Sequence, residues 1–117
     1  QADRAAVARA FAERHGVVLV LKGARTVVAT PDGRISVNPT GNAGLASGGT
    51  GDVLSGIIGA LLAQGLTAGD AARLGVYLHG LAADRVVARH GGELLGLLAS
   101  DLVSELPHTL AAVRTLG

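Results

Sequence analysis

The segment GLASGGTGDVLSG, Gly44 to Gly56, decides the fold expected for this chain. Its glycines gather ahead of Asp52, and an apolar run follows that carboxylate. Consecutive glycines before a helix let backbone N–H groups converge on an anion, and the helix dipole favours negative charge at the same place. The pattern therefore predicts a phosphate-binding loop at 47–51, followed by a helix that begins near Gly51 and ends near Gln64.

Asp52 has two interpretations at this position. A carboxylate in the first turn of a helix is favourable electrostatics and requires no chemistry. A capping aspartate does not need four glycines in the eight residues before it, however, so the glycine density favours a functional carboxylate beside phosphate-binding amides. A P-loop is excluded because no Gly-Lys-Ser/Thr follows the glycines, and the Rossmann fingerprint fits poorly because the loop follows a predicted hairpin.

Upstream of the loop the sequence predicts a sheet. Val17–Leu21 (VVLVL) has no polar residue on either face, which is typical of a parallel strand that is covered on both sides. Thr26–Thr30 and Arg34–Asn38 flank a Pro-Asp-Gly turn signal, and we expect them to pair as a hairpin. Lys22 follows the first strand, at the end where open α/β sheets bind their ligands.

A first helix is expected over Ala2–His15, ended by Gly16. Its predicted apolar stripe contains four residues: Ala6, Val7, Ala10 and Phe11. The helix after the glycine-rich loop has no charged face over Val53–Leu62, so it is predicted to be packed nearly all round. We expect neither this helix nor Val17–Leu21 to face solvent in a stable form of the protein.

Two further helices are predicted near the end of the sequence. Thr67 can cap a helix over 68–89, ended by glycines at 91 and 92. Ser100 or Asp101 can cap another helix, and Pro107 is expected to break or restart it.

Other polar side chains on these helices have structural interpretations. His79 lies on an apolar helix face, which indicates a buried and hydrogen-bonded side chain. Arg85 and Arg89 are one turn apart and indicate a solvated face.

Composition limits the classes of function. The 117 residues suit one domain, and a hydrophobic content of 49% supports a core. A net charge of +1 and only two aromatic residues argue against a nucleic-acid surface. No uncharged stretch has the pattern of a membrane span, and no signal peptide is recognisable. We therefore expect a cytoplasmic protein whose partner is a small-molecule substrate, not nucleic acid or a membrane.

Three motifs, in this order, resemble the bacterial ADP-dependent NAD(P)H-hydrate dehydratases of the ribokinase-like superfamily. They are Lys-Gly-x-x-Thr at 22–26, Thr-Gly-Asn-x-Gly at 40–44 and Gly-Gly-x-Gly-Asp at 48–52, and YLHGLAADRV and LLASDLVSELP continue the resemblance. It implies an α/β fold in which residues 1–117 are the C-terminal portion of one three-layer α/β/α domain. The N-terminal half is absent, so either that half or a homo-oligomer is expected to complete the domain.

The resemblance also implies a reaction. ADP phosphorylates the hydroxyl group on hydrated NADH or NADPH, and loss of phosphate gives NAD(P)H, AMP and phosphate. Asp52 corresponds to the general base, and the anion hole corresponds to the amides of Gly48, Gly49, Thr50 and Gly51. The residues that hold the adenine nucleotide in this family correspond to Gly51 and to the segment Lys22, Gly23, Ala24, Arg25 and Thr26. Mg²⁺ is expected with a phosphoryl donor, but no acidic pair identifies its ligands.

Several alternatives stay open at this point. Asn42 either contacts substrate or nucleotide, or only shapes the turn at Thr40–Gly44. A small-molecule kinase of the same superfamily, acting on a sugar or vitamin precursor, would use the same base and anion hole. A non-catalytic nucleotide-binding fragment is the third possibility, and the short chain favours it.

Overall fold

The computed structural model of the protein describes residues 2–46, 48–91 and 99–116. Ser47 of the predicted phosphate loop and Gly92 at the predicted helix end lie outside the described residues. The elements are, in order, α1 (Ala2–His15), β1 (Leu19–Leu21), β2 (Val27–Ala29), β3 (Ile35–Val37), the 3₁₀ turn η1 (Ala43–Ala46), α2 (Thr50–Ala63), α3 (Ala68–Arg89) and α4 (Ala99–Leu116).

The sheet has the order β1-β2-β3, and both neighbouring pairs are antiparallel. The predicted hairpin is confirmed, with Val28 opposite Ser36, and Gly33 adopts a φ of +90° in its turn. The segment that contains β1 is predicted to be a parallel strand. This prediction is wrong within this sheet, because β1 pairs with β2 in antiparallel orientation. Only the short segment 22–26 joins β1 to β2, whereas a parallel pair needs a crossover of about a dozen residues or more.

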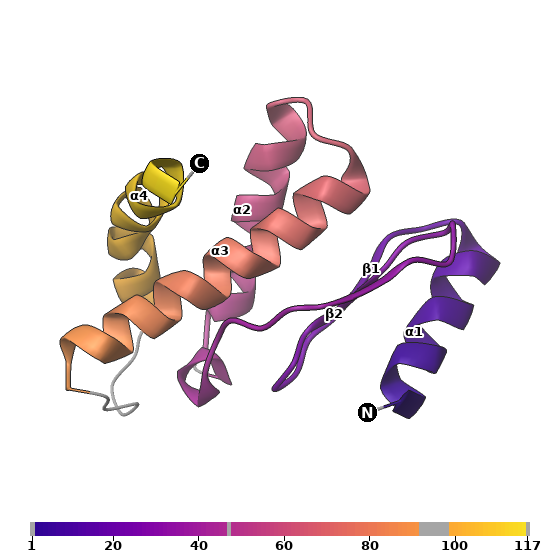
Figure 1. Cartoon of the computed structure of the whole chain (residues 1–117), viewed down its shortest axis with the longest axis horizontal. Helices are drawn as coiled ribbons and strands as arrows, with labels where there is room; N and C mark the ends of the chain where they lie inside the picture. Colours follow the sequence, from indigo (N-terminus) through magenta and orange to yellow (C-terminus); the bar gives the residue numbers. More distant parts are fainter. Residues whose placement is uncertain (1, 47, 92–98, 117) are drawn as a thin grey trace.

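Helices cover both faces of the sheet, which confirms the predicted three layers (Figure 1). Side chains alternate between the faces of a strand, so neighbouring residues of β2 pack into different clusters. On one face Val27 and Ala29 pack with Ala8 and Ala12 of α1. On the other face Val28 packs with residues of α2 and α3, namely Leu54, Ala72 and Val76.

The predicted apolar stripe of α1 is wrong. Its four residues Ala6, Val7, Ala10 and Phe11 are exposed, with Val7 at 64% and Phe11 at 46%. Ala8 and Ala12 are buried in their place, because small side chains let the helix lie close to the sheet. The same orientation lets Arg9 donate a hydrogen bond from Nε to the Gly33 carbonyl at 2.9 Å, across the end of the hairpin.

The helix α2 has nearly the predicted bounds but is not packed all round. Only Thr50 and Leu54 are buried among its residues. The side that carries Gly56 and Gly59 is exposed in the part of the chain that the structure describes. The opposite side meets α3 closely, since a β-carbon added at Gly75 would lie 2.6 Å from Cγ1 of Ile58.

The helix α3 begins as predicted, because the Thr67 side chain accepts a hydrogen bond from the Asp70 amide at 3.2 Å. The expected break at Pro107 is wrong, since α4 continues through this residue. Proline removes the hydrogen bond to the carbonyl four residues earlier, here that of Val103. Both residues are exposed, so water can solvate that carbonyl and the helix persists.

The arginines on α3 have a role that the sequence did not indicate. Arg85 and Arg89 both form ion pairs with Glu105 of α4, whose side chain is 1% exposed. The arginine side chains are 41% and 59% exposed, so the predicted solvated face is confirmed in part, and the ion pairs with Glu105 are an addition to it. The two arginines neutralise a buried carboxylate and so join α3 to α4. The same two helices also meet in a hydrophobic cluster, which consists of Ala82, Ala83, Val86 and Leu102.

No helix among residues 2–46, 48–91 and 99–116 is both long and apolar enough to cross a membrane.

Candidate functional site

The glycine-rich loop ends in a left-handed residue at the start of α2. Gly49 is the N-cap, with φ +85° and ψ −11°, and no side chain caps the helix there. A β-carbon at Gly49 would also lie 3.2 Å from Cβ of Ala99, at the start of α4. The N–H groups in the first turn of a helix have no acceptor within the helix, so this end of α2 can bind an anion. Asp52 stands in that first turn, and its side chain is exposed.

Lys22 lies beside the same turn. A β-carbon added at Gly51 would be 2.7 Å from Nζ of Lys22, so the ammonium group rests against the backbone at Gly51. Lys22 directly follows β1, whereas Gly51 is the second residue of α2. The fold therefore brings the two predicted segments, 22–26 and 48–51, together at one edge of the sheet.

The segment 22–26 is held by an arginine that the sequence analysis did not single out. Arg4 of α1 donates hydrogen bonds to the carbonyls of Leu21, Lys22 and Arg25, at 3.2, 3.1 and 3.0 Å. Its guanidinium also fills the space beside Gly23, where a β-carbon would lie 2.6 Å from Nη2. Each of the residues from Lys22 to Arg25 is itself exposed, so this segment is a fixed backbone turn with open side chains.

The loop that leads to the glycines is bonded to α3. Asn38 donates from Nδ2 to the Val76 carbonyl at 3.1 Å, and Thr40 donates to the Tyr77 carbonyl at 3.0 Å. Gly80 allows the close approach, because a β-carbon there would lie 2.8 Å from the amide nitrogen of Gly41. The helix therefore determines where the loop lies.

The side-chain nitrogen and oxygen of Asn42 both form hydrogen bonds within the protein. Its Nδ2 donates to Oδ1 of Asp84 at 2.9 Å, and its Oδ1 accepts from the Gly44 amide at 2.9 Å. Asp84 also accepts from the Gly41 amide at 3.0 Å. These bonds favour the turn-forming role of Asn42. Sequence reasoning missed Asp84, whose signal was a carboxylate on a helix face otherwise rich in alanine and valine.

His79 is buried as predicted, and it contacts the start of α2. Its Nε2 lies 2.9 Å from the Thr50 carbonyl oxygen. Burial lowers the pKa of His79 below its usual value of 6.5, the hydrogen bond to Thr50 opposes this effect, and the charge of Lys22 lowers the pKa further. The side chain of Thr50 bonds in turn to the Leu45 carbonyl at 2.5 Å, which ties the two ends of the glycine-rich loop together.

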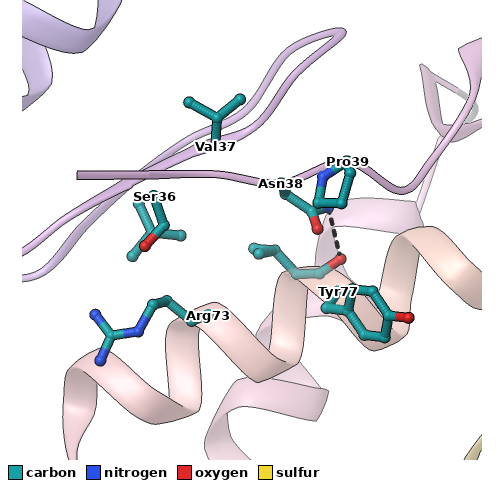
Figure 2. A pocket seen from close by; sticks show the side chains of 8 residues that line it. Ser36, Val37, Asn38, Pro39, Arg73 and Tyr77 are labelled. Atoms are coloured by element: carbon teal, nitrogen blue, oxygen red, sulfur yellow. Dashed lines mark hydrogen bonds between the residues drawn. The ribbon is translucent and has the colours of Figure 1, made fainter. Parts of the chain in front are cut away.

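Two cavities lie away from this turn. One of about 150 Å³ lies between β3 and α3, and Figure 2 shows Asn38 bonded across it near Pro39 and Tyr77. The other, of about 460 Å³, lies by the hairpin turn and the start of α3. Lys22 and Asp52 line neither of these two cavities. Among the described residues, no group of three His, Asp or Glu side chains could hold a metal ion.

The motifs that meet at this site are those of a known family. The family described as NAD(P)H-hydrate dehydratase matches residues 1–108. The chain belongs to this family.

Individual relatives of the family are longer than this chain. A bifunctional NAD(P)H-hydrate repair enzyme of Moorella thermoacetica is 50% identical over 94% of the chain, which covers 20% of that protein. An ADP-dependent (S)-NAD(P)H-hydrate dehydratase of Neisseria meningitidis is 53% identical over 87% of the chain, which covers 34% of that protein. The chain thus spans between 20% and 34% of the length of these curated relatives.

Solved structures show the same fold. An ADP/ATP-dependent NAD(P)H-hydrate dehydratase of Bacillus subtilis, co-crystallized with ATP/Mg²⁺, matches with a TM-score of 0.87 and 40% identity over 96% of the chain and 40% of that protein. A ribokinase-like superfamily protein of Enterococcus faecalis matches with a TM-score of 0.68 and 30% identity over 88% of the chain and 35% of that protein. The chain has the part of the ribokinase-like fold that it shares with these structures.

Proposed function

We propose that this chain supplies the phosphoryl-transfer site for ADP-dependent dehydration of hydrated NADH or NADPH. The observation that carries the proposal is the position of Lys22, whose ammonium group rests against Gly51 one residue from Asp52. A cation therefore rests against the first helical turn, which also carries an exposed carboxylate. This combination can bind a phosphate and can accept a proton from an attacking hydroxyl group.

Asp52 is the general base in this proposal. Its carboxylate takes the proton of the hydroxyl group on the hydrated nicotinamide ring, and the hydroxyl oxygen attacks the terminal phosphorus of ADP. The bond from that phosphorus to the bridging oxygen breaks, and AMP leaves. Phosphate then leaves the ring carbon together with a ring proton, which restores NAD(P)H.

The anion hole consists of the backbone from Gly48 to Gly51. Amides at a helix start, fixed by the left-handed Gly49, stabilise the charge that develops on the transferring phosphoryl group without having to reorganise. Lys22 adds a positive charge beside Gly51. The segment 22–26, with its backbone held by Arg4, is proposed to bind the rest of the adenine nucleotide.

Mg²⁺ fits this site as an ion bound mainly by the nucleotide. Magnesium usually keeps several waters and binds substrate phosphates, so Asp52 can act as the base and not as a ligand of the ion. When bound, the ion would neutralise part of the phosphate charge. The Bacillus subtilis relative was co-crystallized with ATP/Mg²⁺, which agrees with this assignment.

The decisive experiment replaces Asp52 in the full-length gene product. Asp52→Asn keeps the size of the side chain and its capacity to cap a helix but cannot take the proton, so turnover is expected to fall by at least about 10²–10⁴-fold. NADPH formation from hydrated NADPH and ADP is followed by its absorbance, and ADP binding is measured by calorimetry. Binding is expected to change little.

The matched control is Asp70→Asn. Asp70 is also an exposed aspartate in the first turn of a helix, here α3, but it pairs with Arg73. Its replacement is expected to leave turnover unchanged. An Asp52→Asn enzyme with near wild-type turnover would reduce Asp52 to a helix-capping residue.

A further inference from the structure

We propose that His79 is a positioning residue that holds and polarises the Thr50–Gly51 peptide, so that the Gly51 amide becomes a stronger donor to the phosphoryl group. The inference rests on the proposed function, because it takes Gly51 as part of the anion hole. It assigns a role to a buried side chain that does not itself reach the reacting atoms.

The hydrogen bond determines which nitrogen of the ring carries the proton. A carbonyl oxygen can only accept, so the 2.9 Å contact between Nε2 of His79 and the Thr50 oxygen requires Nε2–H. His79 is 6% exposed and lies on α3 between Leu78 and Gly80, which are buried too. The donor is therefore shielded from water and fixed by the packing of α3 against α2.

The contact acts on the amide that the site uses. The Thr50 carbonyl and the Gly51 N–H belong to one planar peptide unit, whose resonance links the oxygen to the nitrogen. A hydrogen bond received at the oxygen draws electron density from the nitrogen and strengthens the N–H as a donor, by about 10–30% per bond. The His79 ring donates at one end of this peptide unit, and Lys22 rests against Gly51 at the other.

The neutral state of the ring suits this role. Burial and the charge of Lys22 both lower the pKa of His79, so the ring is uncharged near neutral pH. A neutral donor orients the peptide without placing a second positive charge near Lys22. The ammonium of Lys22 then stays close to Gly51, where the phosphoryl group is proposed to bind.

The test compares three variants of the full-length gene product. His79→Leu removes the donor, and His79→Gln restores an amide donor at a similar reach. Ile58→Ala is the control, because it removes apolar volume from the contact between α2 and α3 about two helical turns beyond Thr50. His79→Leu is expected to lower kcat by about three- to tenfold with little change in KM for ADP. His79→Gln is expected to stay within about twofold of wild type, and Ile58→Ala to lower Tm but not kcat.

NMR spectroscopy tests the hydrogen bond from His79 to the Thr50 carbonyl oxygen independently of activity. The Gly51 amide proton and nitrogen resonances are expected to move upfield in His79→Leu and to stay near their wild-type positions in His79→Gln. In the wild type, nitrogen-15 spectra of the ring are expected to show the neutral Nε2–H form near neutral pH. This last measurement needs no variant, so another form of the ring would overturn the inference even where His79→Leu fails to fold.

The outcomes separate this inference from the proposed function. An Nδ1–H or doubly protonated ring, or a folded His79→Leu enzyme with unchanged Gly51 resonances and unchanged kcat, would overturn the role of His79. Shifted Gly51 resonances with unchanged kcat would show that the bond exists but does not serve catalysis, which also overturns the inference. Full turnover of Asp52→Asn would instead contradict the proposed function and leave the resonance shifts to be explained by structure alone.

Discussion

Lys22 and Gly51 come from different layers of the fold, yet the Lys22 ammonium fills the space where a β-carbon of residue 51 would stand. The helix backbone at Gly51 therefore needs the smallest residue for a reason unrelated to φ, since Gly51 is not among the glycines with positive φ. The absent side chain makes room for a cation beside the start of α2.

We predict that Gly51→Ala weakens ADP binding without unfolding the protein. The added methyl displaces the end of a flexible lysine side chain, which can move, so Tm is expected to change little. The charge-assisted bond from Lys22 to phosphate is lost or lengthened, and affinity is expected to fall about tenfold or more. Calorimetric titration with ADP checks this. Lys22→Met is expected to match Gly51→Ala, whereas Arg14→Met, which removes an exposed cation on α1, is expected to bind normally.

We predict that Gly49→Ala destabilises the protein and Gly48→Ala does not. Gly49 has a φ of +85° and little space beside it, whereas a β-carbon at Gly48 would meet nothing within 4 Å. A residue with a side chain in the left-handed region costs about 1–2 kcal/mol. Urea unfolding of the two variants measures the difference. Equal free energies of unfolding would show that the loop relaxes out of the left-handed conformation at no cost.

We predict that either Arg85 or Arg89 is sufficient to neutralise the buried carboxylate of Glu105. Either arginine alone can neutralise the buried carboxylate, so Arg85→Met and Arg89→Met are each expected to cost about 1 kcal/mol or less, as for partly exposed pairs. The double variant leaves a buried charge without a partner and is expected to cost about 3–5 kcal/mol. Urea unfolding of the single and double variants tests this, and strictly additive losses would argue against a shared role.

We predict that His79 makes the protein less stable in mild acid. Its pKa is lowered in the folded state, so the unfolded chain binds the proton more readily. The contribution of His79 to the free energy of unfolding is fully present above its ordinary pKa of 6.5 and is lost as the pH falls towards the folded pKa. Unfolding between roughly pH 5 and 8 measures the slope. His79→Gln is expected to reduce it and His108→Gln, at an exposed position, to leave it unchanged.

Several local elements of the fold could be predicted from the sequence. The hairpin, the Thr67 cap and the helix after the glycines follow from turn signals, capping residues and periodicity, which act over a few residues and so are visible in the order of the chain. The motifs around Lys22 and Asp52 also identified the family before any fold was known.

Only the tertiary structure decided what those elements pack against. The sequence pattern favoured Val7 and Phe11 as the buried side of α1, but contact with the sheet selected Ala8 and Ala12, since short side chains allow the closer approach. Likewise, the residues near Glu105 in the sequence do not predict the two arginines that neutralise it. The residues near Thr50 do not predict its hydrogen bond with His79. These contacts join residues far apart along the chain, and packing creates them only when α3 is laid against α2 and α4.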